Sequence, residues 1–275
     1  MKYTVHGIVG ALVFSLGLAV GIYVPQFNQG KNPVESIVPR QPVSESARQY
    51  IVVTKKKSYF ALDSDGNLIP ELRQGRRYYK KGESEYSYKR MLVSNRSAVV
   101  VMDPWLDSGD ATLNEFFKPV MDNKVLPLVI KAVGFGMPVF ILTNDPKKFQ
   151  ADYGSQVDPR LENLAKEYPG KVRILFHQDF DEDSFAGFLK EQSIDTLIYS
   201  GFASNMCVIG RAMGMVPMQT KGFRLFFIPQ ASAAVEFGDS WETAEVHVAT
   251  TSLISQWVGE IIDLGDFLSL EPNAQ

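Results

Sequence analysis

The chain has 275 residues, of which 45% are hydrophobic and 21% charged, and its formal net charge is −3. This length can bury one good-sized core, and the composition is that of an ordinary globular protein. Lysine and arginine are scattered rather than gathered with aromatics in a basic stripe, which argues against a nucleic-acid partner. The single cysteine and three distant histidines offer no metal-ligand spacing, so we expect neither a metal nor another cofactor.

The N-terminus reads as a membrane segment. Lys2 precedes an uncharged run from Gly7 to Val24, which Pro25 closes. A bilayer core needs about 20 apolar residues, with a lower limit near 17. No clear small-x-small cleavage site follows, so residues 1–25 favour an uncleaved anchor over a cleaved signal or a buried soluble helix. We therefore expect the folded part on the extracytoplasmic side of the membrane, or secreted if the segment is cleaved.

Two segments separate this run from the regular part of the chain. Residues 26–49 are rich in Pro, Gln, Ser and Asn without periodicity, which predicts a flexible linker. Residues 50–95 contain short β-type runs around an Asp-Gly-Asn turn at 65–67, which predicts a small β-rich extension. Its Lys, Arg and Tyr side chains would form either a partner surface or the solvated edge of a small sheet.

A regular alternation of apolar runs and amphipathic stretches begins near residue 96. Uniformly apolar strands between amphipathic helices predict a parallel sheet that is covered on both faces. We expect a three-layer, doubly wound α/β domain over 96–270, with a long helix at 239–263. The predicted strands are 97–103, 137–145, 172–178, 195–202 and 223–232.

Chemistry in such folds gathers where the strands end. Asp103 ends the first strand of the domain, and Cys207 follows the fourth. Neither a G-x-G-x-x-G turn nor a phosphate-binding P-loop is present, which weakens nucleotide-binding interpretations. An aspartyl phosphotransferase is rejected, because its second carboxylate is expected two residues after Asp103, where Trp105 stands.

Three blocks carry a family resemblance. They are "VVVMDPWLD" (99–107), "SGFASNMCVIGRAMG" (200–214) and "KGFRLFFIPQASAA" (221–234). In order and spacing, over residues 96–263, they resemble the isochorismatase-like cysteine hydrolases, which include nicotinamidases and isochorismatases. The cysteine block is the specific part. The resemblance implies a mostly parallel six-stranded sheet and hydrolysis of a small amide or ester.

The resemblance also implies roles for individual residues. Cys207 looks like the nucleophile, at a helix N-terminus that would favour its thiolate. Asp103 looks like the general base and acid. The backbone N–H groups of Ala203 and Cys207 would form the oxyanion hole, with a cis peptide bond between Phe202 and Ala203. The reaction would pass through an acyl-thioester.

The family's third residue, a lysine after the third strand, is missing. His177 and Gln178 stand at its place. His177 could supply the positive charge or act as the base, although its strand is expected two positions from the first. Lys147 or Lys148, after the second strand, could reach across instead. The remaining alternative is a weak or inactive site.

Other residues have two interpretations each. Trp105, Phe202 and Trp241 could wall a small substrate pocket or simply pack the core. His247 is expected as a packed or capping helix histidine, and the acidic run 179–183 as a solvated helix start. The Asp/His set with which nicotinamidases bind a metal is missing, so nicotinamide is disfavoured as the substrate.

Two functions therefore remain open. The first is a membrane-tethered cysteine hydrolase acting on a small-molecule amide or ester. The second is a catalytically inactive domain of the same fold that serves as a binding or scaffold module. A homo-oligomer is compatible with either, because members of the family commonly oligomerise.

Overall fold

The computed structural model of the protein describes residues 48–56, 85–149, 151 and 153–271. The membrane segment predicted over 1–25, most of the linker and the turn at 65–67 lie outside these residues and stay predictions. Within the described ranges, no helix combines the length and apolarity needed to cross a bilayer.

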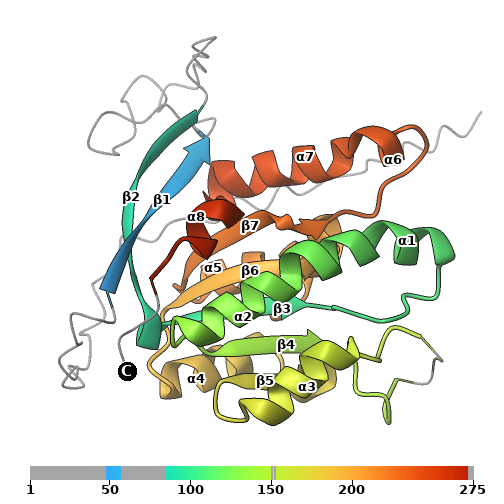
Figure 1. The fold of residues 1–275 in the computed structure, drawn as a ribbon, viewed down its shortest axis with the longest axis horizontal. Coiled ribbons are helices and arrows are strands. Elements are labelled where there is room, and N and C mark those ends of the chain that lie inside the picture. Colours follow the sequence, from blue (N-terminus) through green and yellow to red (C-terminus); the bar gives the residue numbers. More distant parts are fainter. Residues whose placement is uncertain (1–47, 57–84, 150, 152, 272–275) are drawn as a thin grey trace, which may run out of the picture. The chain divides into compact units, whose positions relative to one another are not determined.

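A single mixed sheet organises the described chain (Figure 1). Its order is β2-β1-β8-β7-β6-β3-β4-β5. From β5 to β8 every neighbouring pair is parallel, while β1 pairs antiparallel with both β2 and β8. The strands are β1 (Arg48–Lys56), β2 (Glu85–Val93), β3 (Ser97–Met102), β4 (Val139–Thr143), β5 (Val172–Phe176), β6 (Thr196–Phe202), β7 (Arg224–Ala233) and β8 (Glu260–Ile262).

The predicted doubly wound α/β architecture is confirmed, but the sheet has eight strands, not six. The two extra strands come from the predicted extension, which lengthens the main sheet instead of forming a sheet of its own. The linker prediction is wrong at its end, because β1 already begins at Arg48.

Helices cover both faces, and several are interrupted by short 3-10 or π turns, labelled η. They are η3 (Ser94–Arg96), α1 (Ala111–Val120), η4 (Met121–Val125), α2 (Leu126–Gly134), α3 (Pro159–Glu167), η5 (His177–Asp179), α4 (Glu182–Glu191), η6 (Ser204–Val208), α5 (Met215–Thr220), α6 (Ser240–Thr243), α7 (Glu245–Leu253), η7 (Ile254–Val258) and α8 (Leu264–Leu268).

The long helix predicted over 239–263 is wrong at its end. It stops at η7, and β8 follows directly after Gly259. A Cβ atom on Gly259 would lie 2.8 Å from the Leu225 carbonyl oxygen. The bare glycine backbone therefore lets this segment approach β7 closely enough to pair with it.

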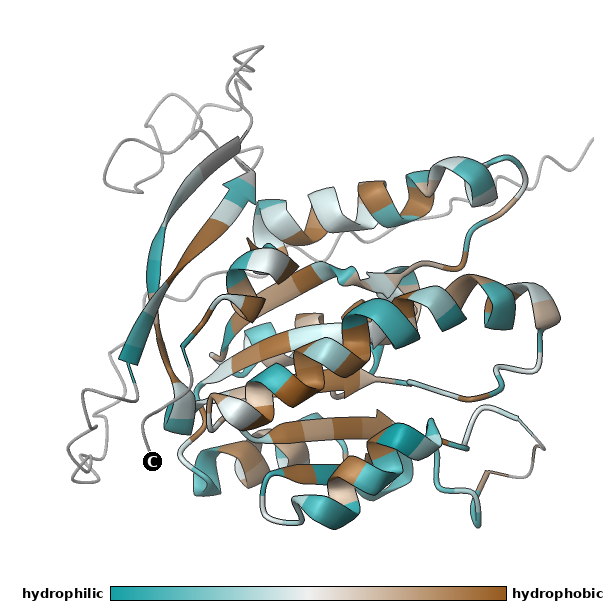
Figure 2. Ribbon diagram, viewed as in Figure 1, coloured by the Kyte–Doolittle hydropathy of each residue, from teal (hydrophilic) through white to brown (hydrophobic). Residues whose placement is uncertain are grey.

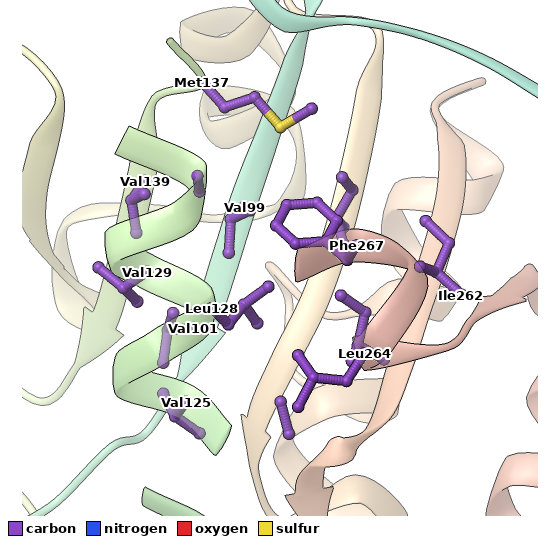
Figure 3. Close-up of a cluster of buried hydrophobic side chains, with 14 of the residues drawn as sticks. Val99, Val101, Val125, Leu128, Val129, Met137, Val139, Ile262, Leu264 and Phe267 are labelled. Carbon is purple, nitrogen blue, oxygen red and sulfur yellow. The ribbon is translucent and has the colours of Figure 1, made fainter. Parts of the chain in front are cut away.

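The alternation of side chains along each strand builds two cores. Val99 and Val101 of β3 face one core, with α2 and α8, while Val100 and Met102 face the other, with α4 and α5. Figure 3 shows the first core, where Val99 lies near side chains of α2 and α8. The central strands are hydrophobic along most of their length in Figure 2, as expected for parallel strands buried on both faces.

A buried carboxylate ties the N-terminal strands to the domain. Glu260 of β8 is 9% exposed and accepts a 2.6 Å hydrogen bond from the Tyr88 hydroxyl. It also accepts bonds from Nε and Nη2 of Arg90, whose guanidinium lies over the Tyr88 ring. Burial and the Glu260 carboxylate raise the pKa of Tyr88, so the phenol stays a donor. This Glu260 cluster links β2 to β8 across β1.

The Glu260 cluster predicts a stability effect. Glu260→Ala leaves Tyr88 and Arg90 without their shared acceptor and should lower the free energy of unfolding by about 2 kcal/mol. Chemical denaturation measures it, with Glu191→Ala, an exposed position at the end of α4, as the control, which should cost less than about 0.5 kcal/mol. Equal effects in the two variants would contradict a clamping role for this carboxylate.

Candidate active site

Asp103 lies directly after β3, and the turn that carries Cys207 directly follows β6, the adjacent strand. Asp103 has a φ of 44°, in the left-handed region that non-glycine residues rarely occupy. Its N–H donates to the Leu142 carbonyl at the end of β4, and its side chain is 1% exposed. Strained residues of this kind gather at functional sites.

The end of β6 approaches β3 very closely. Gly201 has a φ of 91°, and a Cβ atom there would lie 2.1 Å from the Met102 carbonyl oxygen, so only glycine fits. The next peptide bond, Phe202–Ala203, is cis, as the family resemblance predicts. This backbone path brings the segment after β6 to the end of β3, where Asp103 lies.

Cys207 lies near the start of a short helical segment, which begins with the π turn η6 and continues through residues 209–210. Residues 204–208 form the single turn η6, in which the Ala203 carbonyl accepts hydrogen bonds from the N–H groups of Met206 and Val208. The Arg211 N–H donates to the Cys207 carbonyl at the end of this segment, and the expected effect of the helix dipole on the thiol stays a prediction. The oxyanion-hole role of Ala203 and Cys207 stays a prediction.

The Asp103 carboxylate is held from two sides. His177 Nε2 donates to Oδ1 at 2.6 Å, and Arg211 Nε donates to Oδ2 at 3.1 Å. A buried carboxylate needs such compensation, because an unpaired buried charge is strongly destabilising. The negative charge of Asp103 and the positive charge of Arg211 both act on the Cys207 thiol, in opposite directions. These four side chains form the candidate active site.

His177 reaches Asp103 although β5 lies two positions from β3 in the sheet. The 3-10 turn η5 begins at His177 itself and turns the chain back at once. The side chain is 7% exposed, and in the described part of the chain its buried Nδ1 has no hydrogen-bond partner. His177 therefore takes part in the site as a hydrogen-bond partner of Asp103 through Nε2.

Arg211 is the cation of the site, and the sequence prediction missed it. It follows Cys207 by four residues, and its N–H donates to the Cys207 carbonyl, so the two side chains share one side of a helical turn. The four-residue separation of Arg211 from Cys207 is the feature of the sequence that could have identified it. Burial lowers the pKa of Arg211, but the Asp103 carboxylate and Cys207 together outweigh burial and raise it.

The two lysines considered as substitutes lie elsewhere. Lys148 is exposed and pairs with Asp179 at 2.6 Å, and Lys147 is also exposed. The acidic run behaves as predicted, because Asp181 caps α4 through a capping box with Ser184.

The thiol is held in its neutral form. Burial, and next the negative charge of Asp103, raise the pKa of Cys207 to about 11, while Arg211 acts in the opposite direction. The stabilisation of a thiolate by the helix N-terminus stays a prediction. The thiol keeps its proton at neutral pH and lies next to a carboxylate that can accept it.

A cavity of about 200 Å³ opens beside Asp103. Trp105 and Phe202 line it together with Phe117, which stacks on Phe202 at 4.3 Å between ring centroids. Their role in binding a substrate stays a prediction. Cys207 is not part of its wall, so among the four site residues Asp103 is the one that borders it. Trp241 packs against Phe116 instead.

His247 is a packed histidine, as expected. Its Nδ1 contacts Ser204 Oγ at 2.9 Å, and its Nε2 donates to the Pro229 carbonyl at 3.0 Å. Burial lowers the pKa of His247, so the ring is neutral at neutral pH. It contacts the turn that carries Cys207 and makes no hydrogen bond to the thiol among the described residues.

No protein-family model and no curated protein matches the chain. Similar solved structures include a nicotinamidase from Staphylococcus aureus, with 14% identity over 61% of this chain and 98% of that one and a TM-score of 0.46. A cysteine hydrolase from Pseudomonas syringae pv. phaseolicola has 14% identity over 64% and 92%, with a TM-score of 0.44. An isochorismatase from Pseudomonas putida has 15% identity over 70% and 95%, with a TM-score of 0.45.

By name these proteins are a nicotinamidase, a cysteine hydrolase and an isochorismatase. At identities and TM-scores this low, the likeness does not extend to substrate or reaction. Those must be argued from the site itself.

The electrostatics of the site predict how the thiol reacts. Alkylation of Cys207 by iodoacetamide should be slow at neutral pH and rise towards pH 11, because only the thiolate reacts. Asp103→Asn removes a charge that raises the thiol pKa and should accelerate alkylation at pH 8. Arg211→Met removes a charge that lowers the thiol pKa and should slow alkylation. In each variant the rate should change by about tenfold for each unit by which the thiol pKa shifts.

Mass spectrometry reads this reaction without ambiguity, since Cys207 is the only cysteine. A Ser108→Ala variant, away from the thiol, serves as the control and should leave the rate unchanged. Changes of the same sign in the two charge variants would contradict the arrangement of Asp103 and Arg211 around the thiol.

Proposed function

We propose that the protein is a cysteine hydrolase that cleaves a small amide or ester through an acyl-thioester on Cys207. The observation that carries the proposal is the ion pair of a buried carboxylate, Asp103, with Arg211, whose two charges both act on the Cys207 thiol. A thiol needs a base to become a nucleophile and a positive charge to stabilise the thiolate. In this proposal Asp103 is the base and Arg211 supplies the positive charge.

In the proposed reaction, Asp103 accepts the proton of the Cys207 thiol and later returns a proton to the leaving group. As Cys207 Sγ attacks the substrate carbonyl carbon, its proton passes to Asp103, and the carbonyl oxygen becomes an oxyanion beside the N–H groups of Ala203 and Cys207. Collapse breaks the C–N or C–O bond, and Asp103 returns the proton to the leaving amine or alcohol. Water, deprotonated by Asp103, then hydrolyses the thioester, and the products are a free acid and the restored thiol.

Arg211 takes the place of the family lysine in this proposal. An arginine cannot lose its proton in a protein, so it acts as a permanent charge and not as an acid or base. It stabilises the thiolate as it forms and pairs with Asp103 while that group is ionised. His177 completes the arrangement by donating to the other carboxylate oxygen and fixing its orientation.

The second candidate is an inactive domain that serves as a scaffold. The neutral resting thiol and its place outside the cavity wall favour it. Anchoring to a membrane through residues 1–25, with the domain on the extracytoplasmic side, belongs to either proposal. So does self-association into a homo-oligomer.

Trapping the acyl-enzyme tests the proposal. The full chain is incubated with a mixed library of small amides and esters, and mass spectrometry then locates the acyl group. We expect adducts on Cys207 of the native protein and none on Cys207→Ala. Asp103→Asn should lower kcat/KM for a hit by a factor of about 100 or more.

Arg211 gives the sharpest comparison. Arg211→Lys keeps a cation and should retain turnover to within about tenfold, whereas Arg211→Met, of similar length without charge, should lose about 100-fold in kcat. Circular dichroism checks that both variants fold. Absence of any Cys207 adduct from the native protein across the library would refute the hydrolase proposal and favour the scaffold.

A further inference from the structure

A second, larger cavity, of about 590 Å³, lies between α1, β7 and α7. The sheet itself creates it. β8 pairs with β7 only at Phe226 and Phe227, so the rest of that edge has no strand partner among the described residues. Tyr199 of β6 pairs with Phe227 of β7, and the next pair is Gly201 with Ser232. From the first pair to the second, the chain moves on by two residues in β6 and by five in β7. β7 therefore has three extra residues, which form a bulge. A volume of this size is typical of small-molecule sites.

The wall of this cavity is apolar with hydroxyl groups and carries no lysine or arginine among its described residues. Its one carboxylate, Asp263, is already engaged, because its oxygens accept bonds from Gly265 N–H and Gln230 Nε2. Thr251 Oγ1 is buried without a hydrogen-bond partner in the described chain. A buried hydroxyl without a partner is unfavourable, and a ligand atom would relieve it. The wall therefore suits an uncharged molecule with an apolar body and a hydrogen-bonding group.

Two residues of the cavity wall also hold the backbone next to Cys207. Ser232 Oγ donates to the Gly201 carbonyl, and His247 Nδ1 contacts Ser204 Oγ. Gly201 and Ser204 flank the cis peptide bond, and Ser204 begins the turn η6 that carries the thiol. The cavity beside Asp103 and this one share α1 as a wall, because Phe117 lines the former and the neighbouring Phe116 lines the latter.

We infer that the cavity between α1, β7 and α7 is a second binding site, for a small uncharged amphiphile, and that its occupant restrains the turn that carries Cys207. A bound molecule packs the His247 ring against Ser204 and the bulged edge of β7. The thiol lies on η6 and is half-buried, so the position and mobility of this turn affect how readily a reagent reaches it. Occupation of the cavity therefore slows reactions of Cys207.

The binding test uses three probes of one shape on the full chain: 2-naphthalenemethanol, 2-naphthoate and 2-naphthylmethylamine. Calorimetric titration should show binding of the neutral alcohol and affinities at least about tenfold weaker for the two ions. Val248→Trp fills the mouth of the cavity from an exposed helix position and should abolish binding. Ala249→Trp, the next residue of α7 and outside the wall, is the matched control and should bind like the native protein.

Equal binding of the ions, no binding of the alcohol, or binding that survives Val248→Trp would each overturn the site. Its coupling to Cys207 is read separately by iodoacetamide alkylation at pH 9. Saturation with the alcohol should slow alkylation at least about threefold in the native protein and not in His247→Gln, measured at saturation of that variant. An unchanged native rate, or equal slowing in both proteins, overturns the coupling. Neither readout requires turnover, so failure of the hydrolase proposal would be distinguishable.

Discussion

The buried carboxylate of Asp103 is the constraint on which the site depends. A charge that is 1% exposed is tolerated only if its partners are fixed in place. Three chain segments meet to satisfy this requirement: the end of β3 supplies the carboxylate, the turn after β5 supplies His177, and the turn after β6 supplies Arg211. The parallel sheet makes this meeting possible, because it places the ends of these strands along one edge.

The same carboxylate sets the chemistry of the thiol. Its negative charge works with burial to keep Cys207 protonated, while Arg211 works against both. A fully formed thiolate beside an ionised carboxylate would bring two negative charges together in a partly buried place. The arrangement therefore suits transfer of the proton during attack on a substrate, rather than a standing thiolate.

Much of the fold was predictable because it follows from local patterns. Apolar runs such as 97–103 alternate between two buried faces, and that alternation specifies parallel strands under helices on both sides. β8 was not predictable, because three residues after Gly259 continue a helical pattern until the close approach to Leu225 is known. Cys207 and Asp103 were identified through the motif, and the structure brings them together. Arg211 was missed because the motif directs attention to the third strand, whereas the cation comes from the segment that carries the nucleophile.

The N-terminal strands β1 and β2 are part of the main sheet and are not a separate extension. β1 pairs with β8, and the Glu260 cluster holds β2 to β8 as well. β8 in turn pairs with β7 at only two residues, and where that pairing stops the bulge and the second cavity begin. Ser232 and the residues that follow the bulge then pair with the last residues of β6, immediately before the turn that carries Cys207. Backbone pairing thus connects the edge strands β2 and β1, through β8, β7 and β6, to the turn that carries Cys207. An independently folded appendage would lack this connection.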